Sequence, residues 1–241
     1  MDTFITRYPV AFTNAAANLP LIRPAAPSAG IPGYSYRYIP SRSALGHGAA
    51  VASLTNEATG GAALAQAVTG ARPLLQRVGD EAWMKFDGTD DFMNVGTIAA
   101  TGTFTFALVM RVRSQSDKTL VNLTTSGSPV SQMVGGATKL DIRYGSTILA
   151  VPSPTPADGS WHFAMASLNG ASSVITMDAK TASGTVGAAS VTGLALGNSL
   201  AGVGFADYDV AELIAWPTAM TTAQAQTVRA AMIANHPTLL S

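Results

Sequence analysis

Three aspartates form the densest group of side chains able to do chemistry in this sequence. Asp87, Asp90 and Asp91 lie within five positions, in a chain that is only 12% charged. Their carboxylates can accept hydrogen bonds from the N–H groups of a turn, or they can hold a hard cation. Ca²⁺ takes about six to eight oxygens, so loop carbonyls or water would have to complete its shell. The sequence leaves both alternatives open, an Asx-type turn or a Ca²⁺ site, and requires no other cofactor.

Acid–base catalysis by paired carboxylates is not expected. Glycosidases need two acids flanking the scissile bond, and on one strand every second carboxylate would point into the same groove. The glutamates are Glu57, Glu81 and Glu212, remote from one another, and none has an acidic residue two positions away. Nucleophile-elbow, zinc-helix and phosphate-loop motifs are missing as well. We therefore predict no catalytic residues and a protein that is not an enzyme.

Composition argues against two classes of partner. The formal net charge is zero, so no electrostatic footprint for nucleic acid is present. No apolar run approaches the ~20 residues that span a bilayer, so membrane insertion is not expected. The chain has no Cys, which suits synthesis in a reducing cytoplasm. It does not open with a basic segment followed by an apolar one, so export through a leader is not expected.

Period-two patterns predict an all-β fold. The acidic stretch reads as a strand, a tight turn at Asp87-Gly88 and a second strand. The longest alternation runs over 103–113 and places every second residue on one face. We expect a two-sheet antiparallel sandwich whose inter-sheet core includes Phe104, Phe106, Leu108, Trp161 and Phe163.

The two ends of the chain differ from this pattern. Residues 1–33 carry five prolines and predict an extended N-terminal arm. The sandwich would then occupy 34–241. Within it, Thr221 and Gln224 form a capping box, and Ala225, Val228 and Met232 recur at helical spacing. This predicts a short C-terminal helix over 221–235 that lies against one sheet.

Three phrases carry a family resemblance. Phe86-Asp-Gly-Thr-Asp-Asp-Phe, Asp158-Gly-Ser-Trp-His and Val210-Ala-Glu-Leu-Ile-Ala-Trp-Pro occur in the order typical of laminin-G-like, concanavalin A-like jelly-roll domains, which they resemble. The resemblance implies the sandwich. It is silent on the ligand, because one fold hosts many functions.

The resemblance also suggests a setting. Domains of this kind occur in lectins and in bacteriophage virion proteins such as capsid decorations, head fibres and tail fibres. We therefore expect a virion structural protein with a lectin-like domain displayed outward, able to meet host-surface glycans. The arm would bind other virion proteins and support a homo-oligomer, for which a trimer is the expected form. The alternative is a soluble carbohydrate-binding module or a fragment of a glycan-active enzyme.

Overall fold

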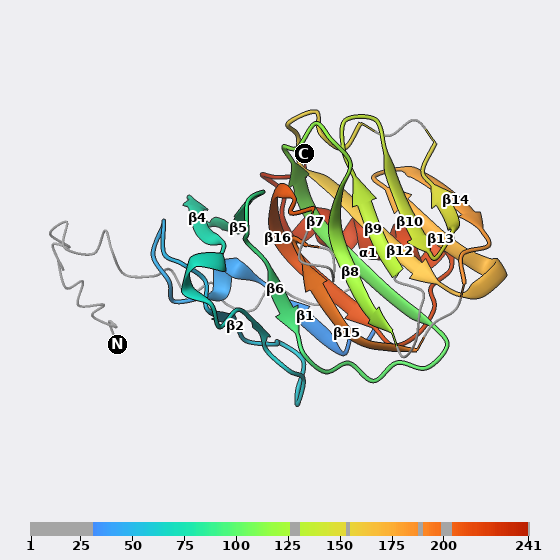
Figure 1. Cartoon of the computed structure of the whole chain (residues 1–241), viewed down its shortest axis with the longest axis horizontal. Helices are drawn as coiled ribbons and strands as arrows, with labels where there is room; N and C mark the ends of the chain where they lie inside the picture. Colours follow the sequence, from blue (N-terminus) through green and yellow to red (C-terminus); the bar gives the residue numbers. More distant parts are fainter. Residues whose placement is uncertain (1–30, 126–130, 153–154, 188–189, 199–203, 241) are drawn as a thin grey trace, which may run out of the picture.

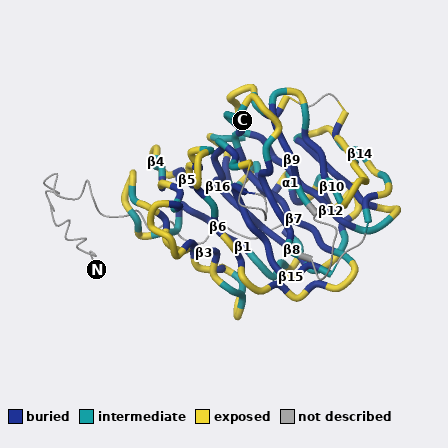
Figure 2. The backbone as a smooth tube through the Cα atoms, viewed as in Figure 1, coloured by how far each residue is buried: buried dark blue, intermediate teal, exposed yellow. Residues whose placement is uncertain are grey.

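Two antiparallel sheets face each other and enclose the main core between them (Figures 1 and 2). The computed structural model describes residues 31–125, 131–152, 155–187, 190–198 and 204–240. The predicted all-β sandwich with a C-terminal helix is confirmed. The predicted arm, 1–33, lies outside the described residues up to residue 30 and stays a prediction.

The first sheet contains eight strands. Seven follow the order β14-β13-β12-β7-β16-β5-β4, and β1 pairs with β16. Neighbouring strands are antiparallel throughout. Their bounds are β1 (Tyr36–Tyr38), β4 (Leu74–Val78), β5 (Glu81–Asp87), β7 (Phe104–Val112), β12 (His162–Leu168), β13 (Ser173–Met177), β14 (Lys180–Gly184) and β16 (Asp207–Trp216).

The second sheet also contains eight strands, in the order β11-β10-β9-β8-β15-β6-β3-β2. The acidic stretch links the two sheets, since its first strand, β5, is in the first sheet and its second, β6, is in this one. The bounds are β2 (Ser53–Leu54), β3 (Leu64–Ala65), β6 (Met93–Val95), β8 (Lys118–Thr125), β9 (Ser131–Gly135), β10 (Leu140–Tyr144), β11 (Thr147–Ala150) and β15 (Val191–Leu196). Short 3₁₀ turns cover Pro40–Arg42, Thr69–Ala71 and Gly170–Ser172.

Strand β7 shows the predicted alternation. Phe104, Phe106 and Leu108 are buried in the main core between the sheets, as expected. The intervening Ala107 and Val109 are buried too, in a second apolar cluster on the outer face of the first sheet. The outer face of this strand is therefore also covered, and it does not meet water there.

The placement of Trp161 and Phe163 between the sheets was wrong. Phe163 is fully buried, but in the outer cluster, and Trp161 packs against that same cluster. Ala164 and Ala166 point toward the second sheet instead. Period-two alternation separates the two faces of a strand, but it cannot identify the inter-sheet face when both faces are buried.

The single α-helix among the described residues provides the outer cover. Helix α1 (Thr222–Asn235) begins after Thr221, and the predicted capping box with Gln224 is present. Its buried residues include the predicted Ala225, Val228 and Met232. They pack in the outer cluster with residues of β7, β12 and β16, so the helix lies against the first sheet as expected (Figure 1).

A β-bulge interrupts β16. Val210 pairs with Met110, but Glu212 already pairs with Val109, which leaves Ala211 as an extra residue. Before the bulge, Val210 faces the main core; after it, Leu213 does. The extra residue therefore turns Glu212 to the outer face of the sheet, away from the apolar interior.

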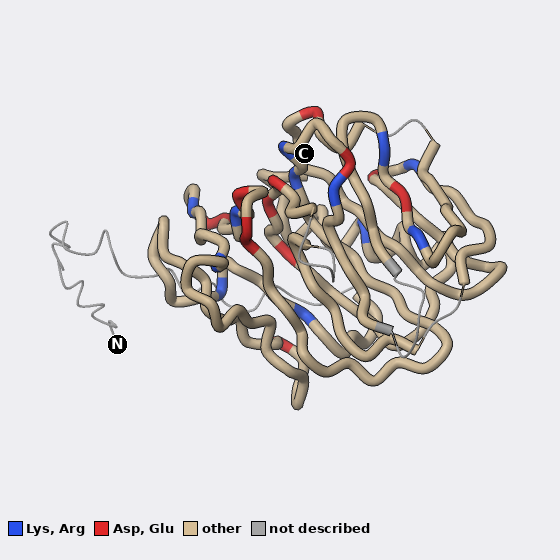
Figure 3. The backbone as a smooth tube through the Cα atoms, viewed as in Figure 1, with Lys and Arg blue, Asp and Glu red and all other residues tan. Residues whose placement is uncertain are grey.

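Charged residues are sparse and unevenly placed. In Figure 3 they lie mostly toward one side of the sandwich, while long stretches of its strands carry none. Within the part of the chain that the structure describes, no helix has the length and apolarity to cross a membrane.

Candidate functional site

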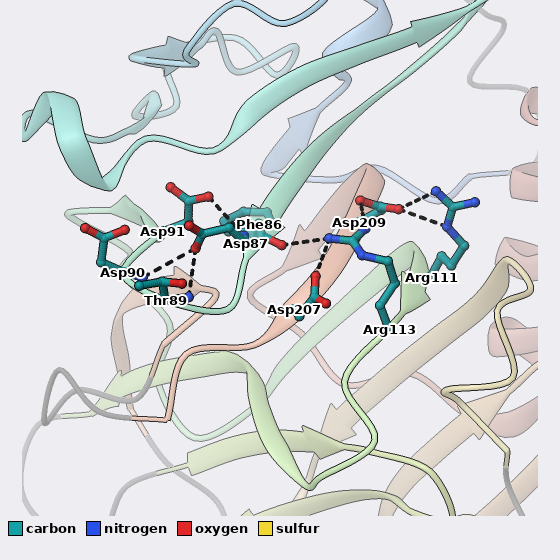
Figure 4. A network of polar contacts seen from close by, with 9 residues as sticks. All are labelled: Phe86, Asp87, Thr89, Asp90, Asp91, Arg111, Arg113, Asp207 and Asp209. Carbon is teal, nitrogen blue, oxygen red and sulfur yellow. Dashed lines mark hydrogen bonds and ion pairs between the residues drawn. The ribbon is translucent and has the colours of Figure 1, made fainter.

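The three predicted aspartates meet in the turn after β5 (Figure 4). One carboxylate oxygen of each lies within 4.8 Å of the others. Asp87 Oδ1 accepts hydrogen bonds from the N–H of Thr89 at 2.8 Å and of Asp90 at 3.4 Å. Asp91 Oδ2 accepts one from the N–H of Asp87 at 3.0 Å. The hydrogen bonds expected of an Asx-type turn are thus present.

The same turn leaves oxygen atoms for a cation. Among the described residues, no hydrogen bond or ion pair engages Oδ2 of Asp87, Oδ1 of Asp91 or either carboxylate oxygen of Asp90. Burial raises the pKa of Asp91 to about 6, and the charges of Asp87 and Asp90 act in the same direction. A divalent cation would relieve this repulsion. The donor set therefore fits a hard ion such as Ca²⁺.

Two arginines join the strands beside this turn. Arg113 binds the carboxylates of Asp207 and Asp209 and donates to the carbonyl of Phe86 at 2.8 Å. Arg111 donates to Asp209 Oδ2 from Nε at 2.9 Å and from Nη2 at 2.6 Å. Asp209 is fully buried, and these two arginines supply ion-pair partners that offset the loss of water around its carboxylate. The cluster fixes the relative positions of β5, β7 and β16 (Figure 4).

Arg111 also contacts two indole rings on the outer face of the first sheet. Its guanidinium lies 5.0 Å from the ring centre of Trp161 and 5.7 Å from that of Trp83. The two rings meet edge to face, 5.4 Å apart. We call these three residues the tryptophan corner. Stacking of this kind holds both partly buried rings in fixed orientations.

A pocket of about 300 Å³ adjoins the tryptophan corner, between the first sheet and α1. Its wall includes Trp161, His162, Asp158, Asp178 and Arg229. The ring of His162 bridges the two carboxylates: Nδ1 lies 2.8 Å from Asp178 Oδ2 and Nε2 lies 3.0 Å from Asp158 Oδ1. Burial would lower the pKa of His162, but the two aspartates outweigh it and raise that pKa. The protonated, doubly donating ring is therefore favoured.

The backbone of Asp178 adopts an unfavourable, left-handed conformation. Its φ of 53° is the only positive φ outside glycine in the described part of the chain. It opens the two-residue turn between β13 and β14. Its N–H donates to the carbonyl of Phe163 at 2.9 Å, and its Oδ1 accepts from the N–H of Phe163 at 3.0 Å. A left-handed aspartate held by surrounding bonds is a kind of strain that often occurs at functional sites.

Arg229 brings a positive charge to the pocket from α1. Its Nε atom is buried and has no hydrogen-bond partner. Across the described residues, no hydrogen bond or ion pair reaches any atom of this guanidinium. A buried donor without a partner is costly, so a bound group that shifts this side chain and bonds to its guanidinium would relieve that cost.

A second group of charges is closed to solvent. His236 lies with Nε2 2.8 Å from Glu212 Oε2 and Nδ1 3.0 Å from Glu81 Oε2. Arg37 donates from Nε to Glu212 Oε1 at 2.6 Å. Burial would lower the pKa of His236, but the two glutamates raise it to about 9. All four side chains are at most 5% exposed, so the network joins the end of α1 to the first sheet.

Sequence reasoning found the acidic turn. It missed the pocket, because Asp158, Asp178 and Arg229 come from three separate elements. It also missed the two pairs of carboxylates that are bridged by a histidine ring, one pair by His162 and the other by His236. The second pair consists of Glu81 and Glu212, which are 131 positions apart in the sequence. The sequence did offer one signal for these two sites. His162 stands in an apolar strand and His236 stands at the end of the predicted helix.

Comparisons with known proteins identify relatives of the fold. No protein-family model matches the sequence, and no curated protein matches it. Among solved structures, Trypanosoma rangeli sialidase in complex with sialic acid superposes with a TM-score of 0.58 at 11% identity, covering 86% of this chain and 33% of the sialidase. This chain thus spans about a third of those sialidases.

Two further structures are similar. The binding domain of Paraclostridial Mosquitocidal Protein 1 has a TM-score of 0.58 at 10% identity, covering 81% of this chain and 51% of that one. Domain 4 of a GH43 extracellular arabinanase from Geobacillus stearothermophilus, in complex with arabinotriose, has a TM-score of 0.53 at 16% identity, covering 68% and 84%. At these identities the likeness shows the fold, a β-sandwich that occurs in glycan-binding and glycan-active proteins.

These findings correct the prediction that the chain is not an enzyme. Sialidases are enzymes, and they contain this fold over a third of their length. The argument from missing acid pairs fails as well, because folding brings Asp158 close to Asp178 and Glu81 close to Glu212. None of the similar structures described here is a bacteriophage virion protein or a laminin-G domain, so that setting stays a prediction.

Proposed function

We propose that this chain is a carbohydrate-binding domain and that the pocket beside α1, with Trp161 on its wall, is its binding site. The observation that carries the proposal is the juxtaposition of a fixed indole ring with three charged side chains around one small pocket. Sugars present apolar ring faces that pack on aromatic rings, and hydroxyls that bond to carboxylates and guanidinium groups. Trp161, Asp158 and Arg229 offer both kinds of contact.

The similar structures support this proposal at the level of the fold. The sialidase was solved with sialic acid and the arabinanase domain with arabinotriose. Both ligands are sugars, and the second protein is a single domain of which this chain covers 84%. A domain of this architecture is therefore suited to hold a saccharide.

The test is glycan binding by the wild-type domain and by Trp161→Ala. A glycan array would identify ligands, and isothermal titration calorimetry with the best neutral ligand and with arabinotriose would give affinities. Loss of one stacking contact is expected to weaken binding about tenfold, and Trp161→Phe should retain part of the affinity. Ile148→Thr is the control, because Ile148 is 52% exposed on β11 in the second sheet.

Two results would contradict the proposal. One is an array on which the folded wild-type domain binds no glycan. The other is a glycan whose affinity is the same for wild type and Trp161→Ala, since that ligand would bind elsewhere. Release of sugar from the same ligands, measured in parallel, would show whether binding leads to hydrolysis.

The biological setting is a separate proposal. Display on a bacteriophage particle, with residues 1–33 bound to other virion proteins and three copies assembled together, rests on the sequence resemblance alone. Detection of the chain in purified particles, and loss of assembly when 1–31 is deleted, would support it. A truncated chain that still joins its particle normally would remove the arm from this role.

A further inference from the structure

Arg229 lies on the wall of the pocket and has no counter-ion within the described part of the chain. Its Nε is buried and unbonded, and no ion pair to it exists among the described residues. The two carboxylates of the same wall make their hydrogen bonds to groups other than Arg229. Asp178 uses one oxygen for Phe163 N–H and the other for His162, and Asp158 Oδ1 accepts from His162 and from the N–H of Ser160. Folding therefore leaves the guanidinium with hydrogen-bonding capacity that nothing else in the wall uses.

The chemistry of the Arg229 guanidinium limits the classes of ligand that could bind to it. Its planar fork matches the two oxygens of a carboxylate, which gives shorter and stronger hydrogen bonds than a neutral hydroxyl. A phosphate dianion fits less well, because the carboxylates of Asp158 and Asp178 lie on the same wall. His162, placed between those two, offsets part of their charge. A ligand that places a single negative charge, such as one carboxylate, next to Arg229 therefore matches the charges of the pocket best.

The remaining features of the pocket fit a sugar ring. A volume of about 300 Å³ is at the lower end for small-molecule sites and has room for about one monosaccharide unit. Trp161 offers an aromatic surface. Asp158, whose Oδ1 accepts from His162 and from the N–H of Ser160, has a second carboxylate oxygen that can accept from a sugar hydroxyl.

We propose that the pocket selects a sugar unit that carries a carboxylate, such as a hexuronic or sialic acid, and that Arg229 binds this carboxylate. The inference rests on the proposed function and deepens it by naming the class of sugar. Arg229 is then the residue that determines specificity, while Trp161 supports binding of acidic and neutral sugars alike.

The test compares ligands that differ in the carboxylate. Calorimetry would measure trigalacturonic acid against its methyl ester, and sialyllactose against lactose, on wild type, Arg229→Gln, Arg229→Lys and Lys118→Gln. Lys118 lies on β8 of the second sheet and does not line the pocket, so Lys118→Gln removes the same charge outside it. We expect wild type and Lys118→Gln to prefer one acidic ligand over its neutral partner by about ten- to a hundredfold. Arg229→Gln should abolish the preference, and Arg229→Lys should keep part of it.

The outcomes separate this inference from the proposed function. Equal wild-type affinity for both members of each pair overturns the inference, as does an Arg229→Gln variant that weakens acid and neutral partner equally. Binding of neutral glycans alone, with loss in Trp161→Ala, also overturns it and leaves the proposed function intact. If no glycan binds at all, the proposed function fails and the inference fails with it. Circular dichroism of each variant confirms that the fold is kept.

Discussion

The ring of His236 lies 2.8 Å from the carboxylate of Glu212, so the residue that ends α1 is bonded to a central strand of the first sheet. Both side chains are buried. This bond places a charged contact beneath the helix end, where the rest of the outer cluster is apolar.

Stability should fall as pH rises through about 9. The folded-state pKa of His236, about 9, lies above the ordinary value of 6.5. The folded chain therefore keeps a proton that the unfolded chain releases, and the stabilisation is complete below about 6.5 and lost on passing through 9. Urea unfolding at pH 6, 8 and 10 would measure this.

The variant His236→Gln isolates that contribution, because His162 also has a raised pKa and acts in the same direction. At pH 6 it should cost on the order of 3 kcal/mol, since it leaves Glu81 and Glu212 buried without their shared partner. Its stability should depend less steeply on pH than that of wild type between pH 6 and 10. Identical slopes would show that His236 does not carry the effect.

Gly88→Ala should destabilise the fold more than Gly79→Ala. Both glycines have a positive φ, 77° and 57°, so each alanine costs about 1 kcal/mol of backbone strain. Only at Gly88 would the new Cβ also lie 2.9 Å from the Cβ of Asp207, whereas at Gly79 nothing lies within 4 Å. We expect about 2 to 3 kcal/mol at Gly88 by urea unfolding. Equal losses would mean that the turn moves freely away from β16.

Thr221→Ala should lower stability by about 1 kcal/mol, because it removes the N-cap of α1. The neighbouring Thr222→Ala is a matched control: Thr222 is also exposed, but it is the first residue of the helix and makes no capping bond. Thermal unfolding followed by circular dichroism would compare the two. A control as unstable as Thr221→Ala would argue against the cap as the cause.

Calcium binding at Asp87, Asp90 and Asp91 remains a proposal. Binding to the folded state alone would raise the melting temperature in added CaCl₂ and lower it again in chelator. Asp90→Asn tests the ion directly, because no turn hydrogen bond depends on the Asp90 side chain. It should abolish the calcium response while changing stability in chelator little. A wild-type melting temperature indifferent to calcium would leave the turn hydrogen bonds as the only role of these residues.

The sequence predicts the parts of this structure that depend on near neighbours. The alternation of Phe104, Phe106 and Leu108 and the capping box at Thr221 are local patterns, and both were confirmed. The outer position of Phe163 depends instead on α1, which lies about sixty residues further along the chain by number. The pocket depends on side chains from a loop, a strained turn and a helix. No spacing rule joins Asp158, Asp178 and Arg229 before the fold is known.

The extra residue in β16 sets a rule for how this strand can change in length. Deleting Ala211 alone would restore regular pairing, and Val210 and Leu213 would still face the main core while Glu212 stays on the outer face. Deleting one residue elsewhere in the strand would instead turn the side chains on one side of the deletion to the opposite face. Over evolutionary time, this strand should therefore accept the loss of one residue at the bulge and reject single deletions at its other positions, so its length carries the same information as its apolar residues.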